Sequence, residues 1–176
     1  IRFESSLLEP EVWDLAAKSG CRSLYFGLES ANQRIINLVK KDTNISAAIT
    51  NLTEATRVGI WSHVMAFYGF PSETEEEAED TRQFLLKNQE IIHSVEMYFF
   101  VLYKHAPVIN MVDQLNMQVK ENSEHDFALD FYYTPKSGQT VEDAINRYEN
   151  FYKNDFDPWA MRINAREHVF LYITHY

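Results

Sequence analysis

The sequence predicts an α/β fold with about four parallel strands, followed by a mainly helical C-terminal extension. Two observations lead to this fold class. A helix, a glycine, an apolar strand and a second glycine follow one another twice, around residues 20–27 and around residues 59–69. Single or double helices separate the expected strands, and such crossovers join strands that run in parallel. The alternation then stops, so we expect one domain over residues 1–105 and an extension of unknown role over residues 106–176.

The N-terminal part is expected to contain a strand, a helix and a second strand. Residues 1–4 have the pattern of a short strand. Pro10 suits the first turn of a helix, and Gly20 stands where a helix commonly ends in a left-handed residue. Residues 24–26 are apolar and predict a buried strand, which ends at residues 27–30.

Two helices and a third strand follow. Ser30 and Gln33 have the spacing of a capping box, which predicts that a helix begins at Ser30. A second helix is expected over residues 46–58, and Gly59 ends it. Residues 60–68 are mostly apolar and predict the third strand.

The remaining elements are marked less strongly. Ser72 and Glu75 form a second capping-box candidate at the start of a helix. Residues 95–102 predict the fourth strand. In the extension, residues 140–152 have a helical pattern, whereas residues 169–173 fit either a helix or a strand.

Composition narrows the classes of function. The chain has 176 residues, of which 45% are hydrophobic, and this suits a globular domain with a substantial core. The formal net charge of -10 repels phosphate backbones, so we do not expect nucleic-acid binding. No apolar run reaches the roughly 18 residues of a membrane span, and no signal peptide is visible. We therefore expect a cytoplasmic protein without a membrane partner.

Cys21 is the only cysteine of the chain. One cysteine excludes an internal disulfide framework and indicates a reducing compartment. It also excludes an iron–sulfur cluster held by this chain alone, because several thiolates bind such clusters. The acidic run over residues 73–80 complements a helix dipole, so we expect no metal site there. The chain begins at Ile1 in strand-like sequence and without methionine, so we expect its natural start upstream.

Two strand ends carry a resemblance to a known family. The first has the sequence GLES at residues 27–30 and is followed by Lys40 and Lys41. The second has the sequence GFPSET at residues 69–74. In this order and in a βα context, they resemble the radical S-adenosylmethionine (radical SAM) superfamily, particularly the branch that often carries a cobalamin-binding domain.

The resemblance implies a partial TIM-like (β/α) barrel. Residues 1–105 would form the C-terminal half of that barrel, so the sheet would have an open edge that needs a cover. The cysteine run that binds the 4Fe-4S cluster in this family is absent here and would lie upstream of Ile1. The resemblance therefore implies a partner, the missing N-terminal half of the same protein, which would hold the cluster.

The resemblance also implies contacts with S-adenosylmethionine at the end of the second strand. Ligands of parallel βα folds bind at the carboxyl ends of strands. Glu29 would accept the ribose hydroxyls, with Ser30 beside it. The basic residue that binds the methionine carboxylate falls on Lys41, and Lys40 is the neighbour with which it could be confused.

The end of the third strand is implied to pack on the adenine ring. Gly69 would let a flat ring approach the backbone closely, with Phe67 and Pro71 near the ring. Arg2, at the end of the first strand, is a further polar candidate. The sequence identifies no catalytic residue.

Three functions remain open from the sequence. The first is a fragment of a radical SAM iron–sulfur enzyme, inactive alone, with cobalamin as a further cofactor where the intact protein carries that domain. The second is a non-radical βα-barrel enzyme of the hydrolase or aldolase type, with Glu29 and Glu73 as the acid–base pair. The third is a non-catalytic interaction module. The substrate, a small molecule or a peptide, cannot be identified from the sequence.

Overall fold

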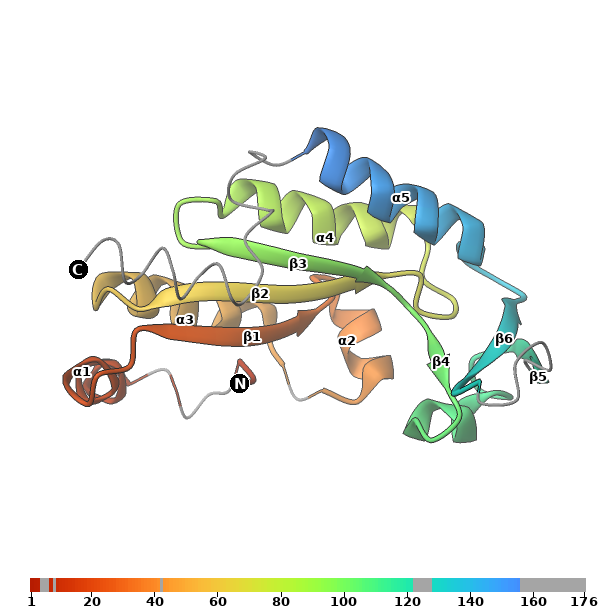
Figure 1. The fold of residues 1–176 in the computed structure, drawn as a ribbon, viewed down its shortest axis with the longest axis horizontal. Coiled ribbons are helices and arrows are strands. Elements are labelled where there is room, and N and C mark those ends of the chain that lie inside the picture. Colours follow the sequence, from red (N-terminus) through yellow and green to blue (C-terminus); the bar gives the residue numbers. More distant parts are fainter. Residues whose placement is uncertain (4–6, 8, 42, 122–127, 156–176) are drawn as a thin grey trace.

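The centre of the molecule is a sheet of three parallel strands (Figure 1). The computed structural model describes residues 1–3, 7, 9–41, 43–121 and 128–155. The strands are β1 (Ser23–Glu29), β2 (Trp61–Tyr68) and β3 (Ser94–Phe99), paired in the order β1-β2-β3. Because all three run the same way, their carboxyl ends meet at one edge of the sheet.

Helices connect the strands in the predicted alternation. α1 (Pro10–Lys18) precedes β1, and α2 (Gln33–Val39) and α3 (Ile45–Arg57) lie between β1 and β2. α4 (Glu75–Lys87) lies between β2 and β3. The helix predicted over residues 46–58 corresponds to α3 with a shift of one residue. The expected α/β fold with parallel strands is confirmed.

The first of the four expected strands is reduced to one bridge. Among the described residues, Arg2 forms a single parallel bridge with Gly27, and the Gly27 N–H donates to Ile1 O at 3.1 Å. Where four parallel strands were expected, the described residues thus form three parallel strands and this bridge. Glu4, the expected end of the first strand, lies outside the described residues.

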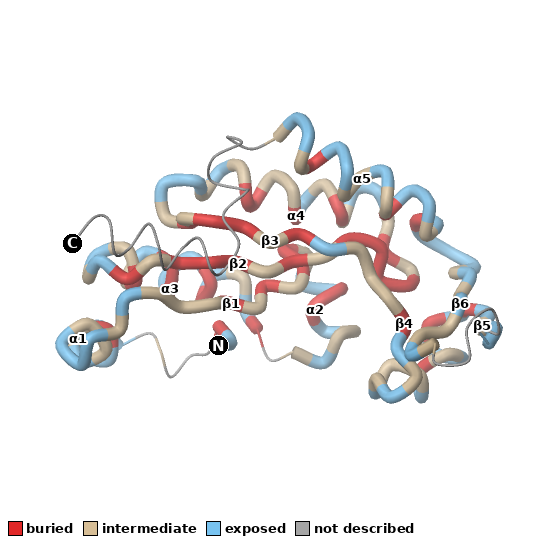
Figure 2. Tube along the Cα trace, in the orientation of Figure 1, coloured by how far each residue is buried: buried red, intermediate tan, exposed pale blue. Residues whose placement is uncertain are grey.

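The core lies between the sheet and its helices. Side chains alternate between the two faces of a strand, and every second strand residue is buried with apolar residues of α3 and α4. These residues are Phe26, Leu28, Val64, Ala66, Val95 and Met97 from the strands, with Leu52, Ala55, Phe84 and Leu85 from the helices. Figure 2 shows the buried segments concentrated along the three strands.

The predicted Ser30 capping box was wrong. α2 begins after Asn32, whose side chain accepts hydrogen bonds from the backbone N–H groups of Arg34 and Ile35. Ser30 is buried, and its hydroxyl lies 3.0 Å from the hydroxyl of Thr81 on α4. The Ser30 hydroxyl, which the local sequence assigns to the N-cap of α2, therefore bonds to a residue of α4 instead.

The predicted capping box of Ser72 and Glu75 was two residues too early. Thr74 caps α4, with its hydroxyl accepting from the Glu77 N–H and the Glu77 carboxylate accepting from the Thr74 N–H. Ser72 has a φ of 77° and cannot adopt the extended conformation of an N-cap residue. The acidic first turn does lie at the positive end of the helix dipole, as predicted.

The strand predicted over residues 95–102 ends early, at Phe99. The chain then continues into a separate antiparallel sheet that the sequence did not predict. Its strands are β4 (Leu102–Tyr103), β5 (Met117–Glu121) and β6 (Asp130–Pro135), in the order β4-β6-β5, with a 3-10 turn at Pro107–Met111. A second apolar cluster supports this sheet and includes Ile35, Phe70, Leu102, Met111, Leu115 and Met117.

The helix predicted over residues 140–152 is confirmed as α5 (Val141–Asn154), which packs on β2 and β3 beside α4 (Figure 1). The Tyr152 hydroxyl donates to Met97 O at 3.1 Å and accepts from Met97 N at 2.8 Å, at the outer edge of β3. Residues 169–173 lie outside the described residues. Over the described part of the chain, the helices are too short or too polar to cross a membrane.

Candidate functional site

Two of the predicted site residues meet at the carboxyl edge of the sheet. Glu29 ends β1 and Gly69 directly follows β2, so both lie at the same edge, as predicted. The register shifts at this end of β1, because Gly27 pairs with Met65 whereas Glu29 pairs with Ala66, which leaves one extra residue in β1. Such a bulge bends the strand and changes the direction of its last side chain.

Glu29 has an unusual backbone conformation. Its φ is 66°, in the left-handed region, and the Ser30 N–H donates to Leu28 O at 2.8 Å to close a three-residue turn around it. A non-glycine residue held this way costs about 1–3 kcal/mol. A Cβ atom on Gly27 would lie only 2.8 Å from Glu29 Oε1, so the carboxylate lies directly over the bare backbone of Gly27. The bulge, the turn and the glycine together fix the position of this carboxylate.

Lys41, and not Lys40, reaches Glu29. Lys41 Nζ lies 2.8 Å from Glu29 Oε1, and the two side chains are 32% and 19% exposed. Lys40 is exposed and forms the left-handed C-cap of α2, with a φ of 57°. The chain reverses at Lys40, and the next residue brings its ammonium group to the strand end. The structure thus pairs a carboxylate and an ammonium that the sequence placed in one site.

Ser30 and Arg2, the other two residues predicted near β1, differ in burial. Ser30 is fully buried, and its hydroxyl lies against Thr81 and accepts from the Asn32 N–H at 3.1 Å. Arg2 is exposed and forms the backbone bridge with Gly27. Both flank the end of β1, and their contact with a ligand stays a prediction.

The residues after β2 form a compact aromatic turn. Gly69 has a φ of 82°, and Pro71 is buried. The ring of Phe67 is half-buried, with its centre 6.2 Å from that of Phe70 and 6.0 Å from that of Phe100. Of the predicted adenine-side residues, Phe67 therefore lies at the end of β2, and Gly69 and Pro71 lie in the turn that follows it, beside the strand that ends in Glu29.

Glu73 anchors this turn from within. It is fully buried, and its Oε2 accepts from the Gly69 N–H at 2.6 Å and from Gln139 Nε2 at 3.3 Å. Burial raises the pKa of Glu73 to about 7, although the bond from Gly69 opposes the shift. This carboxyl group therefore has a structural role inside the turn, and the alternative acid–base pair with Glu29 stays a prediction.

Arg34 connects α2, which follows β1, to the segment that follows β2. The sequence did not identify this residue as part of the site. Its guanidinium donates through two nitrogens to both carboxylate oxygens of Glu77. It also donates to Ser72 O at 2.8 Å. These partners lie some 40 residues away in the chain, so no local pattern announces them. With the bond between Ser30 and Thr81, this contact fixes the two strand ends relative to each other.

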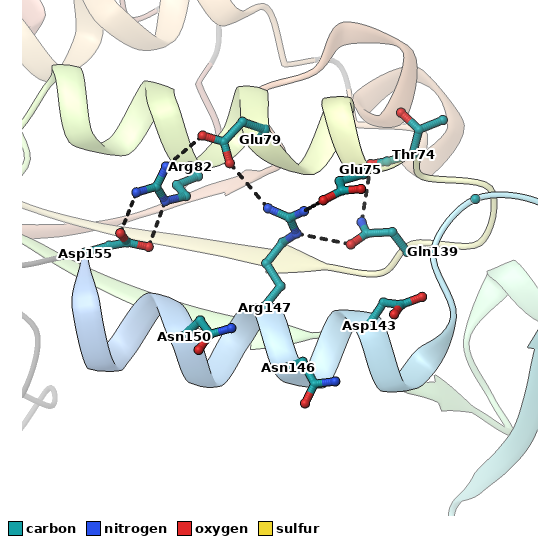
Figure 3. A pocket seen from close by; sticks show the side chains of 11 residues that line it. Thr74, Glu75, Glu79, Arg82, Gln139, Asp143, Asn146, Arg147, Asn150 and Asp155 are labelled. Carbon is teal, nitrogen blue, oxygen red and sulfur yellow. Dashed lines mark hydrogen bonds and ion pairs between the residues drawn. The ribbon is translucent and has the colours of Figure 1, made fainter.

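Two pockets of the described structure lie away from the pair of Glu29 and Lys41. The first, of about 550 Å³, lies between α4 and α5, and Figure 3 shows Arg147 reaching across it to Glu79. The second, of about 310 Å³, is lined mainly by aromatic residues of β6 and of the connection from β3 to β4. Neither wall includes Glu29 or Lys41, so the nucleoside-sized cleft expected at the strand ends stays a prediction. Within the described residues, no three His, Cys, Asp or Glu side chains are arranged to hold a metal ion.

Comparisons with known sequences agree with the strand-end motifs. The family model of the radical SAM superfamily matches residues 1–85. An uncharacterised methyltransferase of Pyrococcus horikoshii is 36% identical over 70 residues, which cover 40% of this chain and 15% of the relative. The bacteriochlorophyllide d C-12(1)-methyltransferase of Chlorobaculum tepidum is 30% identical over 87 residues, covering 47% and 18%. The matches therefore span less than a fifth of either relative.

Solved structures show the same fold. The radical S-adenosylmethionine methyltransferase TsrM from Kitasatospora setae, solved with cobalamin and a 4Fe-4S cluster, has a TM-score of 0.66 at 16% identity, covering 93% of this chain and 37% of TsrM. Coproporphyrinogen III oxidase from Escherichia coli, a radical SAM enzyme, has a TM-score of 0.59 at 17% identity, covering 88% and 31%. The chain thus shares its fold with these TIM-barrel-like radical SAM enzymes, and residues 1–85 match the family model of the radical SAM superfamily.

Proposed function

We propose that this chain provides the nucleoside and amino-acid contacts to S-adenosylmethionine in a radical SAM enzyme. The observation that carries the proposal is the pair of Glu29 and Lys41 at the bulged end of β1, beside the turn at Gly69. The match of residues 1–85 to the family model of the superfamily supports it. A carboxylate and an ammonium in one partly buried place suit the ribose hydroxyls and the methionine carboxylate of this cofactor.

Each end of the ligand has a candidate contact. Glu29 accepts hydrogen bonds from both ribose hydroxyls. Lys41 has three N–H donors, so it can bind the ligand carboxylate while it keeps one bond to Glu29. The adenine ring packs on the turn of Phe67, Gly69 and Pro71, where a glycine leaves room for a flat ring.

The two flanking residues have supporting roles in this proposal. Ser30 holds the end of β1 in place through Thr81, since its hydroxyl is buried against that residue. Arg2 presents an exposed guanidinium next to Gly27 and adds positive charge at the border of the site.

The iron–sulfur cluster requires ligands that this chain does not have. Cys21 is its only cysteine, and several thiolates bind a 4Fe-4S cluster. We infer that the missing N-terminal half of the same protein supplies them, and that this chain alone is inactive. When bound, the cluster supplies the electron for reductive cleavage of the sulfonium.

Methyl transfer is the reaction class we propose. Both curated relatives named above are methyltransferases, and the TsrM structure contains cobalamin. We therefore propose cobalamin as a second cofactor of the intact protein and a small molecule or a peptide as methyl acceptor. The single cysteine supports a cytoplasmic location, where thiols stay reduced.

Anaerobic calorimetry of the full-length protein with S-adenosylmethionine tests the binding site. Glu29→Ala and Lys41→Met should each lower the affinity roughly 10- to 100-fold, because each removes a charge-assisted contact worth about 1.5–3 kcal/mol. Lys40→Met is the matched control and should leave the affinity unchanged. Wild-type affinity in both Glu29→Ala and Lys41→Met, with the fold intact, would contradict the proposed site.

A further inference from the structure

The C-terminal extension contacts the turn at Gly69–Glu73 through a short segment before α5. The backbone N–H of Gln139 donates to Glu73 O at 2.7 Å. Its side-chain amide donates to Glu73 Oε2 and to Thr74 O, both at 3.3 Å. Gln139 is therefore bonded to both the main chain and the side chain of the residue that ends the turn.

Arg147 fixes the orientation of that amide. Arg147 Nε donates to Gln139 Oε1 at 3.1 Å, so the oxygen of the amide points to α5 (Figure 3). The NH₂ group of the amide bonds to Glu73 Oε2. The amide has separate donor and acceptor ends, and each has a suitable partner here.

A second contact comes from β6. The Tyr133 hydroxyl donates to two carbonyl oxygens, Phe100 O at 3.2 Å and Gly69 O at 3.3 Å, which share its one hydrogen. The Gly69 N–H is bonded to Glu73, as described above, so both polar groups of the Gly69 backbone have partners. The orientation of this peptide unit is therefore set from two sides.

The extension also approaches the turn too closely for any additional side chain. A Cβ atom on Gly69 would lie 2.4 Å from the Cβ of Ala144 on α5. A Cβ atom on Gly138 would lie 2.4 Å from Glu73 O, and Gly138 has a φ of 82°. Gly69 thus lies against the methyl group of Ala144, and Gly138 lies against the backbone of Glu73, with glycine at each close contact.

We propose that Tyr133, Gln139 and Ala144 are positioning residues that hold the turn at Gly69–Glu73 in its ligand-binding shape. The extension then belongs to the cofactor site, although none of its residues needs to touch the cofactor. This inference rests on the proposed function, because it assigns the turn to the adenine side of S-adenosylmethionine. Ser72 has a φ of 77°, which is strained for a residue other than glycine, and contacts from outside the turn offset that strain.

The test combines two mild substitutions in the full-length protein, Tyr133→Phe and Gln139→Ala. Tyr133→Phe removes only the hydroxyl and keeps the ring, so the fold should survive. Tyr103→Phe with Gln118→Ala is the matched control, since these residues are exposed on β4 and β5. The affinity for S-adenosylmethionine, measured by calorimetry, should fall about 5- to 20-fold in the test variant and stay unchanged in the control.

Hydrogen–deuterium exchange separates positioning from general destabilisation. The peptide that covers residues 66–74 should exchange faster in the test variant, while peptides of β1 and α3 should keep their wild-type rates. Wild-type exchange in residues 66–74 together with wild-type affinity would overturn the proposal, and so would equally faster exchange throughout the chain. If the wild-type protein did not bind S-adenosylmethionine, the proposed function would fail, and the exchange rates alone would decide whether the extension holds the turn.

Discussion

The ammonium group of Lys41 contacts the carboxylate of Glu29 at the end of β1, where the backbone of Glu29 is held in a strained left-handed conformation. The pair is partly exposed to solvent, and such pairs add less than about 1 kcal/mol to stability. The left-handed backbone of Glu29 costs at least as much. The arrangement is therefore close to neutral for stability, which is expected where residues are placed for binding.

Glu29→Gly should separate stability from binding. Glycine relieves the left-handed strain, which offsets the loss of the ion pair, so the free energy of unfolding should stay within about 1 kcal/mol of wild type. Glu29→Val should instead destabilise by about 1–3 kcal/mol, because a β-branched residue is strained at this φ. Urea denaturation of the chain measures both values. Equal destabilisation by glycine and valine would show that the backbone of Glu29 is not strained.

Gly27→Ala should move the Glu29 carboxylate without unfolding the strand. The added methyl group would meet Glu29 Oε1 at 2.8 Å, and the end of a flexible side chain can shift away. We expect stability to change by less than about 1 kcal/mol, while the affinity of the full-length protein for S-adenosylmethionine falls about tenfold. Thermal melting and calorimetry check the two parts. Unchanged affinity would mean that ligand binding does not depend on where this carboxylate lies.

Glu73 should make the stability of the chain depend on pH. Burial raises the pKa of Glu73 from 4.5 to about 7, with Glu77 adding to the shift and Arg147 and Arg34 opposing it. The protonated form is favoured in the folded state. The stabilisation is therefore fully present below pH 4.5 and is lost as the pH rises through about 7.

The substitution Glu73→Gln should remove this dependence. Between about pH 5 and about pH 7, the free energy of unfolding of the wild-type protein should fall by up to about 1.4 kcal/mol per pH unit relative to that of the variant. Urea denaturation of both proteins at several pH values gives the two curves. Parallel curves would show that Glu73 does not titrate in this range.

Iron and sulfide should fail to build a stable cluster on this chain. Cys21 is its single thiolate source, and a 4Fe-4S cluster needs several. After anaerobic reconstitution and desalting, the absorbance at about 400 nm should match that of a Cys21→Ser control. One four-iron cluster per chain, retained through gel filtration, would contradict the proposal that the cluster ligands lie elsewhere.

The order of the elements could be predicted because it depends on local signals. Apolar runs between glycines gave β1 and β2, and helical spacing gave α3 and α5. The predicted N-cap of α2 was wrong because a tertiary contact determines it. The hydroxyl of Ser30 bonds to Thr81, and Asn32 caps the helix instead. The antiparallel strands were missed because they are short and few of their residues are buried, which leaves no clear apolar pattern.

The candidate site was predictable only where a motif marks it. Glu29 and Gly69 stand in the two strand-end motifs, and the parallel sheet brings those ends together. Arg34 and Gln139 carry no such signal. Their partners lie far away in the chain, so their roles emerge only when α2 and α5 are packed against the loop after β2.

The hydroxyl of Tyr152 limits which edge of the parallel sheet can pair with a further strand. It is bonded to the N–H and the C=O of Met97, two of the backbone groups with which a further strand would pair along the outer edge of β3. An incoming strand on that side would have to displace α5. On the opposite border, the described residues add only the bridge of Arg2 to β1. Among the described residues, a further strand can therefore join this sheet at β1 without displacing α5, which gives the sheet one open side and one closed side.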